Sequence, residues 1–220
     1  MVDLQRKLQT TLPDARLDVR PLPGLDKIAL GLINADYQTG PLAAEVMHAV
    51  IANPAYWAFC WGSGLSLARW LIANPKEVAS KKVLDLGPGS GVVAIAAALA
   101  GSASVFACDN DPNAIAATEA NAALNNVVVE CALDLAMLNP DFDLLLMADV
   151  LYDRANFGLI EIAKQMSRRI IIADSRVADV MDPEFEIVHR DLSLTVPNLG
   201  EFDEFKEVRF FEWRKPVDSF

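Results

Sequence analysis

A glycine-rich turn is the segment of this chain whose residue types and spacing first suggest a ligand site. Asp85-Leu86-Gly87-Pro88-Gly89-Ser90-Gly91 follows a short apolar run and precedes an alanine-rich one. Glycines at alternate positions keep side chains away from the backbone, so a ligand can come close to the N–H groups at the start of the following helix. A carboxylate inside an apolar strand is costly unless it is paired or reaches the strand end. We therefore expect Asp85 to hold either the loop or the ligand.

A second acidic residue stands where a ribose-binding carboxylate is expected. Asp109 lies 18 residues beyond Gly91, at the end of the next predicted strand, and α/β folds that bind dinucleotides place there the acid that accepts hydrogen bonds from ribose hydroxyls. The nicotinamide-binding pattern G-x-G-x-x-G fails because Val92 replaces its third glycine, and no lysine follows Gly91 as a P-loop requires. The sequence therefore favours a nucleoside ligand with a ribose and without an essential phosphate.

An acid and an aromatic residue leave a third strand together. In Asp149-Val150-Leu151-Tyr152 a carboxylate and a phenol follow an apolar strand, at the edge where open α/β sheets bind ligands. Asp149 can accept a hydrogen bond from an incoming amine, and Tyr152 offers a ring face to a cation. The alternative is structural, with a helix-capping aspartate and a buried tyrosine. For the helix expected from about residue 155, Asp153 is the better N-cap candidate.

Three large aromatic residues precede the glycine-rich turn. Trp57, Phe59 and Trp61 fall within five positions, beside alanine and glycine. Such a group suits a flat adenosyl ligand or a lid over a cation. Core packing explains Trp57 and Phe59 equally well, so we retain Trp61 as the candidate ligand contact.

A regular alternation of strands and helices must position these residues. Apolar runs predict strands at 83–86, 104–108, 127–131, 144–148 and 170–173, and periodic patterns predict helices at 42–50, 63–72, 92–100, 112–124 and 155–166. That alternation indicates a parallel sheet with helices on both faces. Two later runs, 185–191 and 208–213, would close the sheet as an antiparallel edge pair. Asp111 followed by Pro112 is typical of a helix N-terminus.

Length and composition predict one main domain with an appendage. The chain has 220 residues, 53% of them apolar, which is enough to bury a core without disulfides or metal. Residues 1–55 differ from the rest in their scattered prolines and glycines, and we interpret them as an N-terminal extension that packs on the core. Residues 56–220 then form the ligand-binding domain.

Hydrophobicity and charge disfavour membranes and nucleic acids. The longest apolar run, 92–100, is far shorter than the roughly 20 residues that span a bilayer. The start of the chain lacks the apolar segment of a secretory signal, so we expect a cytoplasmic protein. A net charge of −11 repels phosphate backbones. Cys60, Cys108 and Cys131 lie far apart, which disfavours zinc ligands and disulfides. Each stands among apolar neighbours, which predicts a buried thiol.

With these motifs the sequence resembles the class I S-adenosylmethionine-dependent methyltransferases, whose first motif reads like Val83–Gly91 and whose second ends in an acid like Asp109. It is similar in particular to the seven-strand group that contains the lysine methyltransferase of the electron transfer flavoprotein β-subunit. That closer likeness is carried by residues 54–64 and 149–153. Two turns differ: Gly62-Ser63-Gly64 stands where that group has Pro-Gly-Gly, and Ala173-Asp174-Ser175-Arg176 stands where it has a Gly-Asp-Pro-Gly-like turn.

The resemblance implies a fold, a cofactor and a set of roles. The fold would be a doubly wound, mostly parallel seven-stranded sheet of the Rossmann-like methyltransferase type, and the cofactor would be S-adenosyl-L-methionine. Trp61 would lie along the cofactor and Asp134 would meet the adenine, whereas Asp149 and Tyr152 would face the methyl acceptor as the catalytic pair. The expected cofactor-binding residues are Trp61, Asp85, Gly87, Gly89, Gly91, Asp109, Asn110 and Asp134.

Three functions follow from the resemblance and the composition. The first is a protein-lysine N-methyltransferase, because an acidic surface suits a basic protein target. The second is a small-molecule N- or O-methyltransferase, and the third is a protein that binds S-adenosylmethionine without catalysis. Methyl transfer from a sulfonium depends on positioning and needs no enzyme nucleophile, so the missing Ser-His-Asp or Cys-His set does not count against an enzyme.

Overall fold

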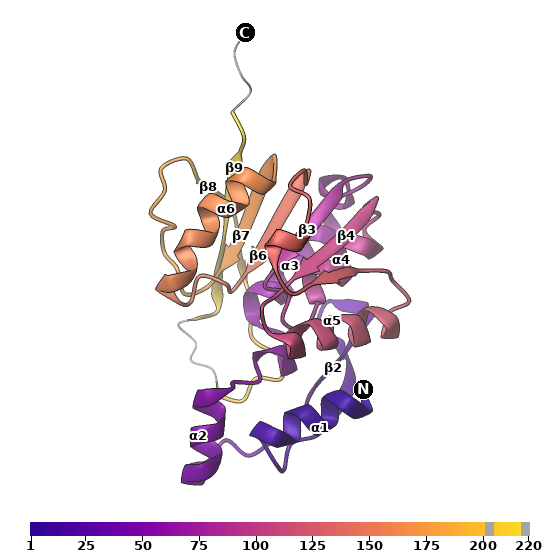
Figure 1. Ribbon diagram of the computed structural model, residues 1–220, viewed down its shortest axis with the longest axis vertical. Helices are drawn as coiled ribbons and strands as arrows, with labels where there is room; N and C mark the ends of the chain where they lie inside the picture. The colour runs from indigo at the N-terminus through magenta and orange to yellow at the C-terminus, as the bar shows by residue number, and fades with distance from the viewer. Residues whose placement is uncertain (201–204, 217–220) are drawn as a thin grey trace.

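The computed structural model describes residues 1–200 and 205–216, and a twisted sheet forms its centre (Figure 1). Among these residues, seven strands lie side by side in the order β5-β4-β3-β6-β7-β9-β8. They are β3 (Lys82–Leu86), β4 (Ser104–Cys108), β5 (Glu130–Ala132), β6 (Leu144–Ala148), β7 (Arg169–Asp174), β8 (Glu186–Leu192) and β9 (Glu207–Arg214). The strands from β5 to β7 are parallel, β9 runs antiparallel to β7, and β8 runs antiparallel to β9. The predicted doubly wound sheet with an antiparallel C-terminal edge is therefore confirmed.

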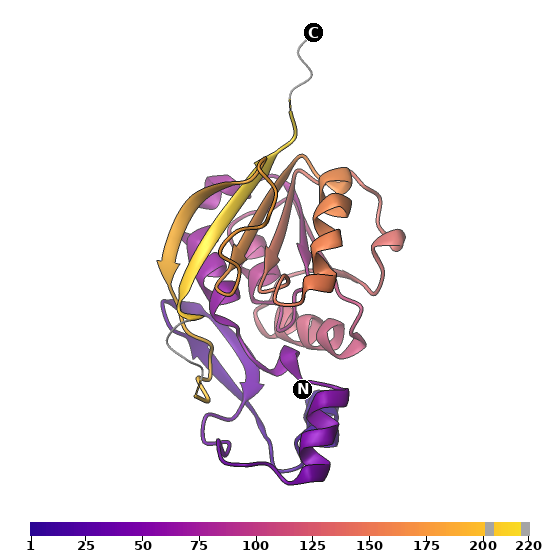
Figure 2. The same cartoon turned by 90° about the vertical axis from the view of Figure 1, so that its left-hand side faces the viewer.

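Helices cover both faces of this sheet (Figures 1 and 2). They are α3 (Gly62–Ala73), α4 (Val92–Leu99), α5 (Pro112–Leu124) and α6 (Gly158–Met166). In β6, Leu144 is buried with α3 and α4, whereas its neighbour Leu145 is buried with α6. Side chains alternate between the faces of a strand, so a fully apolar strand is buried on both sides. The continuous apolar runs in the sequence reflect this two-sided burial.

Two predicted elements differ most in extent from the observed ones, and the others agree to within two residues at each end. The strand expected at 127–131 is observed only at Glu130–Ala132, because these are the residues that pair with β4, and Val128 is 84% exposed. The helix expected at 155–166 begins as the 3-10 helix η4 (Arg154–Phe157) and continues as α6. Its N-cap is Asp153, as predicted, which accepts a hydrogen bond from Ala155 N at 2.9 Å.

The first 55 residues contain a helix–hairpin–helix arrangement that their composition did not predict. Helix α1 (Val2–Thr11) is followed by the antiparallel strands β1 (Leu17–Leu22) and β2 (Leu25–Ile33), and then by α2 (Ala44–Ala52), which matches the helix predicted at 42–50. The hairpin turns at Gly24, whose φ of +74° favours glycine. Figures 1 and 2 place these elements on one side of the seven-stranded sheet, where α1 and β2 contact α5 and α2 contacts α1.

Two amide side chains, one of them buried, attach β2 to α5 and to the glycine-rich turn. Asn121, which is 1% exposed, accepts a hydrogen bond from Gly31 N at 2.9 Å and donates one to Ser90 O at 2.9 Å. Asn125 accepts a hydrogen bond from Ala29 N and donates one to Ala29 O. Apolar side chains of β2 join the core that α3 and α4 cover. The N-terminal residues thus contact the sheet domain through polar and apolar groups together.

The cysteines occupy apolar surroundings. Cys60 and Cys108 are buried, as predicted, and Cys131 is half-buried. Burial raises the pKa of the Cys108 thiol to about 11 and that of Cys131 to about 12, so both are protonated at neutral pH. Over the described ranges, no three His, Cys, Asp or Glu side chains are grouped to hold a metal ion. Within the same ranges, no helix has the length and apolar character needed to cross a membrane.

Candidate active site

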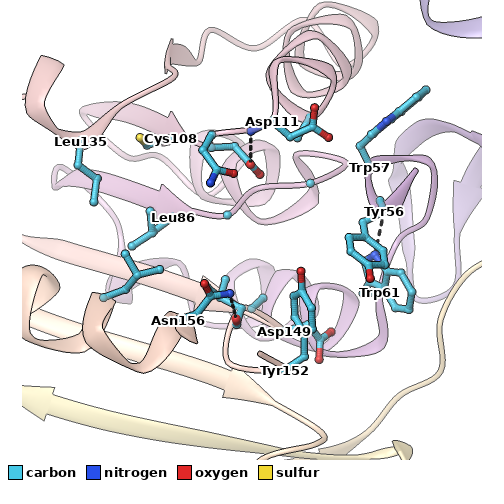
Figure 3. A pocket seen from close by; sticks show the side chains of 18 of the residues that line it. Tyr56, Trp57, Trp61, Leu86, Cys108, Asp111, Leu135, Asp149, Tyr152 and Asn156 are labelled. Atoms are coloured by element: carbon cyan, nitrogen blue, oxygen red, sulfur yellow. Dashed lines mark hydrogen bonds between the residues drawn. The ribbon is translucent and has the colours of Figure 1, made fainter. Parts of the chain in front are cut away.

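A cavity of about 740 Å³ opens at the carboxyl ends of β3, β4 and β6 (Figure 3). This is the edge at which open α/β sheets bind ligands, and the volume lies within the range of small-molecule sites. Its wall comes from the glycine-rich turn, from the segments after β4, β5, β6 and β7, and from the 3-10 helix η1 (Tyr56–Ala58). The sheet therefore gathers into one place residues that are far apart in the sequence.

The glycine-rich turn between β3 and α4 uses each glycine differently. Gly87, Gly89 and Gly91 have φ values of +73°, +53° and +82°, a region that favours glycine. A Cβ at Gly87 would lie 2.7 Å from Val150 Cγ2, and one at Gly91 would lie 3.0 Å from Thr118 Cα. A Cβ at Gly89 would meet no protein atom within 4 Å, and Gly89 lines the cavity. Packing therefore requires Gly87 and Gly91, while Gly89 leaves room on the ligand side.

Asp85 lies behind the turn rather than in the cavity wall. Its side chain is 1% exposed, and its Oδ2 accepts a hydrogen bond from Ala94 N, in the first turn of α4, at 2.9 Å. Its Oδ1 has no hydrogen-bond partner among the described residues. Burial raises the pKa of this carboxyl to about 7, because apolar surroundings disfavour the charged form. Of the two roles expected for Asp85, its contacts support holding the loop.

Three polar side chains surround the side of the cavity next to β4 and β5. Asp109, at the end of β4, accepts a hydrogen bond from Asp111 N at 2.9 Å, and burial raises the pKa of its carboxyl. Asn110 follows it and is exposed. Asp134, after β5, caps the next short helix by accepting a hydrogen bond from Ala136 N. All three side chains line the cavity, so carboxylate and amide groups are available for the hydroxyls and the base of a nucleoside.

Asp149 lies across the cavity from Asp111 (Figure 3) and joins the end of β6 to the start of α3. Its Oδ1 accepts a hydrogen bond from Ser63 Oγ at 2.6 Å, and its Oδ2 accepts one from Ser63 N at 3.0 Å. The side chain is 7% exposed. Burial, together with the negative charge of Asp174, raises the pKa of Asp149 to about 6. The carboxylate is thus held in one direction beside a helix N-terminus, which favours negative charge.

Aromatic side chains form the wall beside Asp149 (Figure 3). The Tyr152 ring lies 5.5 Å from that of Tyr56, edge to face, and the Tyr56 ring lies 5.8 Å from that of Trp61. The indole Nε1 of Trp61 donates a hydrogen bond to Tyr56 O at 2.9 Å. Trp57 is buried and also lines the cavity. Because Tyr152 is 51% exposed, the alternative of a buried tyrosine at this position is wrong.

Asp174 and Arg176, which in the sequence stand out only as a departure from a family turn, belong to this site. Asp174, at the end of β7, is fully buried, and its Oδ1 accepts hydrogen bonds from the backbone N atoms of Arg176 and Val177. The Arg176 side chain lines the cavity, and its Nη1 lies 3.7 Å from Asp149 Oδ1. Their position after β7, at the same sheet edge as Asp149, was the signal that could have found them.

Most of the predicted site residues line this one cavity, and two lie behind it. Those in the wall are Trp61, Gly87, Gly89, Asp109, Asn110, Asp134, Asp149 and Tyr152. Asp85 and Gly91 are outside the wall: Asp85 binds the first turn of α4, and the absence of a side chain at Gly91 leaves room for Thr118. The sequence therefore located the cavity, and the structure separates the residues at its surface from those that shape it.

The charge of the cavity fits a cationic ligand such as S-adenosylmethionine, which carries a positive sulfonium. Over the described residues, the wall contains four aspartates and one arginine. The open space beside Gly89 gives the backbone access that an adenosyl group needs, and the Asp109 carboxylate stands where a ribose acceptor is required. The residues present therefore fit this cofactor.

Sequence comparison points to the same class of protein. The family model for ribosomal protein L11 methyltransferase (PrmA) matches residues 69–169. The electron transfer flavoprotein β-subunit lysine methyltransferase of Danio rerio is 46% identical over 103 residues, which cover 46% of this chain and 40% of the relative. The Homo sapiens protein of the same name is 41% identical over 101 residues, which cover 44% of this chain and 38% of the relative. The matched segment thus spans about two fifths of the length of these relatives.

Solved structures share the fold. A 16S rRNA methyltransferase of T. thermophilus, solved with AdoMet and guanosine, has a TM-score of 0.56 at 14% identity, covering 92% of this chain and 51% of that one. The ribosomal protein L11 methylase of Lactobacillus delbrueckii has a TM-score of 0.51 at 24% identity, covering 68% of this chain and 78% of that one. At these identities the likeness shows the fold alone. In sequence and fold together, the chain resembles the class I S-adenosylmethionine-dependent methyltransferases and, among them, the electron transfer flavoprotein β-subunit lysine methyltransferase group, as its motifs predicted.

Proposed function

We propose that this chain binds S-adenosylmethionine and transfers a methyl group to a lysine side chain of a protein. The observation that carries the proposal is one cavity with two chemically different sides. One side has an open glycine turn and Asp109, and the other has a fixed carboxylate, Asp149, beside aromatic rings. The sequence relatives add support, because they are named as lysine methyltransferases of a protein subunit.

The side next to β3 and β4 would hold the cofactor. Gly89 would admit the ligand against the backbone, Asp109 would accept hydrogen bonds from the ribose, and Asp134 would lie at the adenine. Trp61 would lie along the ligand between the two sides of the cavity. Bound there, S-adenosylmethionine would supply a methyl group on a positively charged sulfur.

The side next to β6 would bind and orient the acceptor amine. A lysine in water has a pKa of about 10.4, so holding it neutral at pH 7 costs roughly 4.6 kcal/mol, at about 1.36 kcal/mol per pKa unit. Transfer from water into a buried cavity lowers a lysine pKa and reduces this cost. The proton leaves to water at the open mouth, where Tyr152 is exposed.

Asp149 would then fix the direction of the neutral amine. Its pKa of about 6 keeps the carboxylate ionised at neutral pH, so it can accept a hydrogen bond from the amine N–H. The ring of Tyr152 would face the nitrogen as it gains positive charge. Holding the two reactants in line supplies most of the rate, so the enzyme needs no nucleophile of its own.

Label transfer separates the proposed function from its alternatives. The purified protein is incubated with methyl-labelled S-adenosylmethionine and either a fractionated lysate or a purified electron transfer flavoprotein β-subunit. We expect label in a protein band, recovered as methyl-lysine after acid hydrolysis. Label in the small-molecule fraction would support a small-molecule methyltransferase. Cofactor binding by calorimetry without any transfer would support a binding protein. Gly89→Val, which we expect not to bind the cofactor, serves as the control.

A further inference from the structure

The acceptor side of the cavity contains one cationic side chain among the described residues, Arg176. Its guanidinium carbon lies 5.6 Å from the ring centre of Trp61 and 4.7 Å from that of Phe205. Its Nη1 lies 3.7 Å from Asp149 Oδ1. Two aromatic rings and a carboxylate are the surroundings that attract an ammonium or guanidinium group. We call the space between Trp61, Phe205 and Asp149 the cation box.

Parts of the cation box are held in place without the help of the guanidinium. Asp149 is fixed by two hydrogen bonds from Ser63, and the Trp61 indole donates to a backbone carbonyl of η1. The backbone of Arg176 is fixed because its N–H is bound by Asp174. The Arg176 side chain has several rotatable bonds and is 26% exposed. Displacement of the guanidinium would therefore leave the carboxylate and the indole in place, because their own hydrogen bonds hold them.

We propose that the cation box is the binding place of the acceptor's amino group and that Arg176 fills it until an acceptor arrives. This inference rests on the proposed function. An acceptor that arrives as an ammonium ion is repelled by the guanidinium, so it must displace the guanidinium before its own amino group can reach Asp149. To do so, the acceptor needs favourable contacts outside the box.

The need for outside contacts makes Arg176 a specificity-determining residue. A lysine on a protein brings neighbouring surface to the mouth of the cavity, where the rings of Tyr56 and Tyr152 are 46% and 51% exposed. Aromatic rings of this kind provide large contact area at protein interfaces. A free small amine brings no such surface. Arg176 thus excludes free amines and admits a lysine presented by a protein.

Turnover of a free amine tests this assignment. Release of S-adenosylhomocysteine with n-butylamine as acceptor is measured for the wild type, for Arg176→Ala and for Arg154→Ala. Arg154 is exposed and follows Tyr152 by two residues, outside the cavity wall, so its loss controls for the removal of one positive charge. We expect Arg176→Ala to raise kcat/KM for n-butylamine at least tenfold and Arg154→Ala to match the wild type. Methylguanidinium should inhibit Arg176→Ala in competition with n-butylamine, because it refills the box.

Two results would overturn the assignment. One is n-butylamine turnover in a folded Arg176→Ala protein that does not exceed that of the wild type, and the other is the absence of inhibition by methylguanidinium. Arg176→Met, which keeps the apolar stem, should show the same gain if the alanine variant is unstable. Calorimetry with S-adenosylmethionine separates the failures. A wild type that does not bind the cofactor refutes the proposed function and this inference together, whereas one that binds it, with no gain in either variant, refutes only the role of Arg176.

Discussion

Asp85 provides a sharp test of the electrostatics behind the cofactor turn. Its carboxyl is buried, with one oxygen bound by Ala94 N and the other without a hydrogen-bond partner among the described residues. Asp85→Asn keeps the size of the side chain and leaves a carbonyl to accept the Ala94 N–H, but it cannot ionise. We expect the free energy of unfolding of this variant, relative to that of the wild type, to increase with pH.

The size of the effect follows from the pKa of Asp85, which is about 7 in the folded protein against 3.8 as the ordinary value. An acid whose pKa is raised by folding stabilises the folded state fully below the lower value, and this stability is lost as the pH rises through the higher one. Relative to a pH at which Asp85 is protonated in both states, ionisation of Asp85 lowers the free energy of unfolding of the wild type by roughly 1.7 kcal/mol at pH 5 and by roughly 4.3 kcal/mol at pH 9, at about 1.36 kcal/mol per pKa unit. Asp85→Asn has no carboxyl to ionise at this position, so its free energy of unfolding minus that of the wild type should increase by about 2.5–3 kcal/mol from pH 5 to pH 9.

Urea unfolding followed by tryptophan fluorescence measures this difference at pH 5 and pH 9. Any constant cost of the new amide group cancels, because the comparison is between the two pH values for the same pair of proteins. Asp26→Asn, at an exposed aspartate of β2, controls for the loss of one charge. A stability difference that stays constant, or that shrinks as the pH rises, would refute the reasoning, provided that the m-values agree.

Further substitutions test the ligand contacts. Asp109→Ala should weaken S-adenosylmethionine binding by about 1.5–3 kcal/mol, the range for a hydrogen bond to a charged group, and unchanged affinity by calorimetry would contradict the ribose assignment. Gly89→Val should abolish S-adenosylmethionine binding while the far-UV circular dichroism stays native, because a Cβ at this position meets no protein atom within 4 Å. The positive φ at residue 89 should cost the variant roughly 1–2 kcal/mol of stability. Retained binding would show that the ligand does not approach the backbone at Gly89. Asp149→Ala should lower the methyl transfer rate at least tenfold, about 1.4 kcal/mol in barrier height, with little change in cofactor affinity. An equal loss of transfer rate and of cofactor affinity would show that Asp149 contacts the cofactor rather than the acceptor. Tyr152→Phe should keep the cation–π contribution of the ring that Tyr152→Ala removes, so equally impaired transfer in the two variants would assign the effect to the hydroxyl.

The sheet and its helices were predictable because their signals are local. The strand at 144–148 and the helix at 112–124 were predicted with the observed limits, and Asp111 caps that helix by accepting a hydrogen bond from Asn113 N. The N-terminal hairpin was missed for a local reason as well. Pro23 and Gly24, which by composition suggest an irregular extension, form its turn, and the strands on either side were too weakly patterned to identify.

The candidate site was predictable as far as strand order alone determines it. Parallel strands bring their carboxyl ends to one edge, so Asp109 and Asp149 were expected to lie near the same ligand. Contacts that depend on the direction of a side chain could not be predicted. Asp85 reaches into the first turn of α4, and Arg176 meets Trp61 from a different strand end. Both contacts require the three-dimensional path of the chain.

Asn121 connects the N-terminal hairpin directly to the glycine-rich turn at the cavity. A single carboxamide donates to Ser90 O in the glycine-rich turn and accepts from Gly31 N in β2. The planar amide cannot reorient for one partner without disturbing the other, so a ligand that stiffens the turn also restrains the hairpin. Exchange of the Gly31 amide hydrogen with solvent should therefore slow when S-adenosylmethionine is added. Hydrogen exchange in β2, which is not a strand of the seven-stranded sheet, would then indicate whether the cavity is occupied.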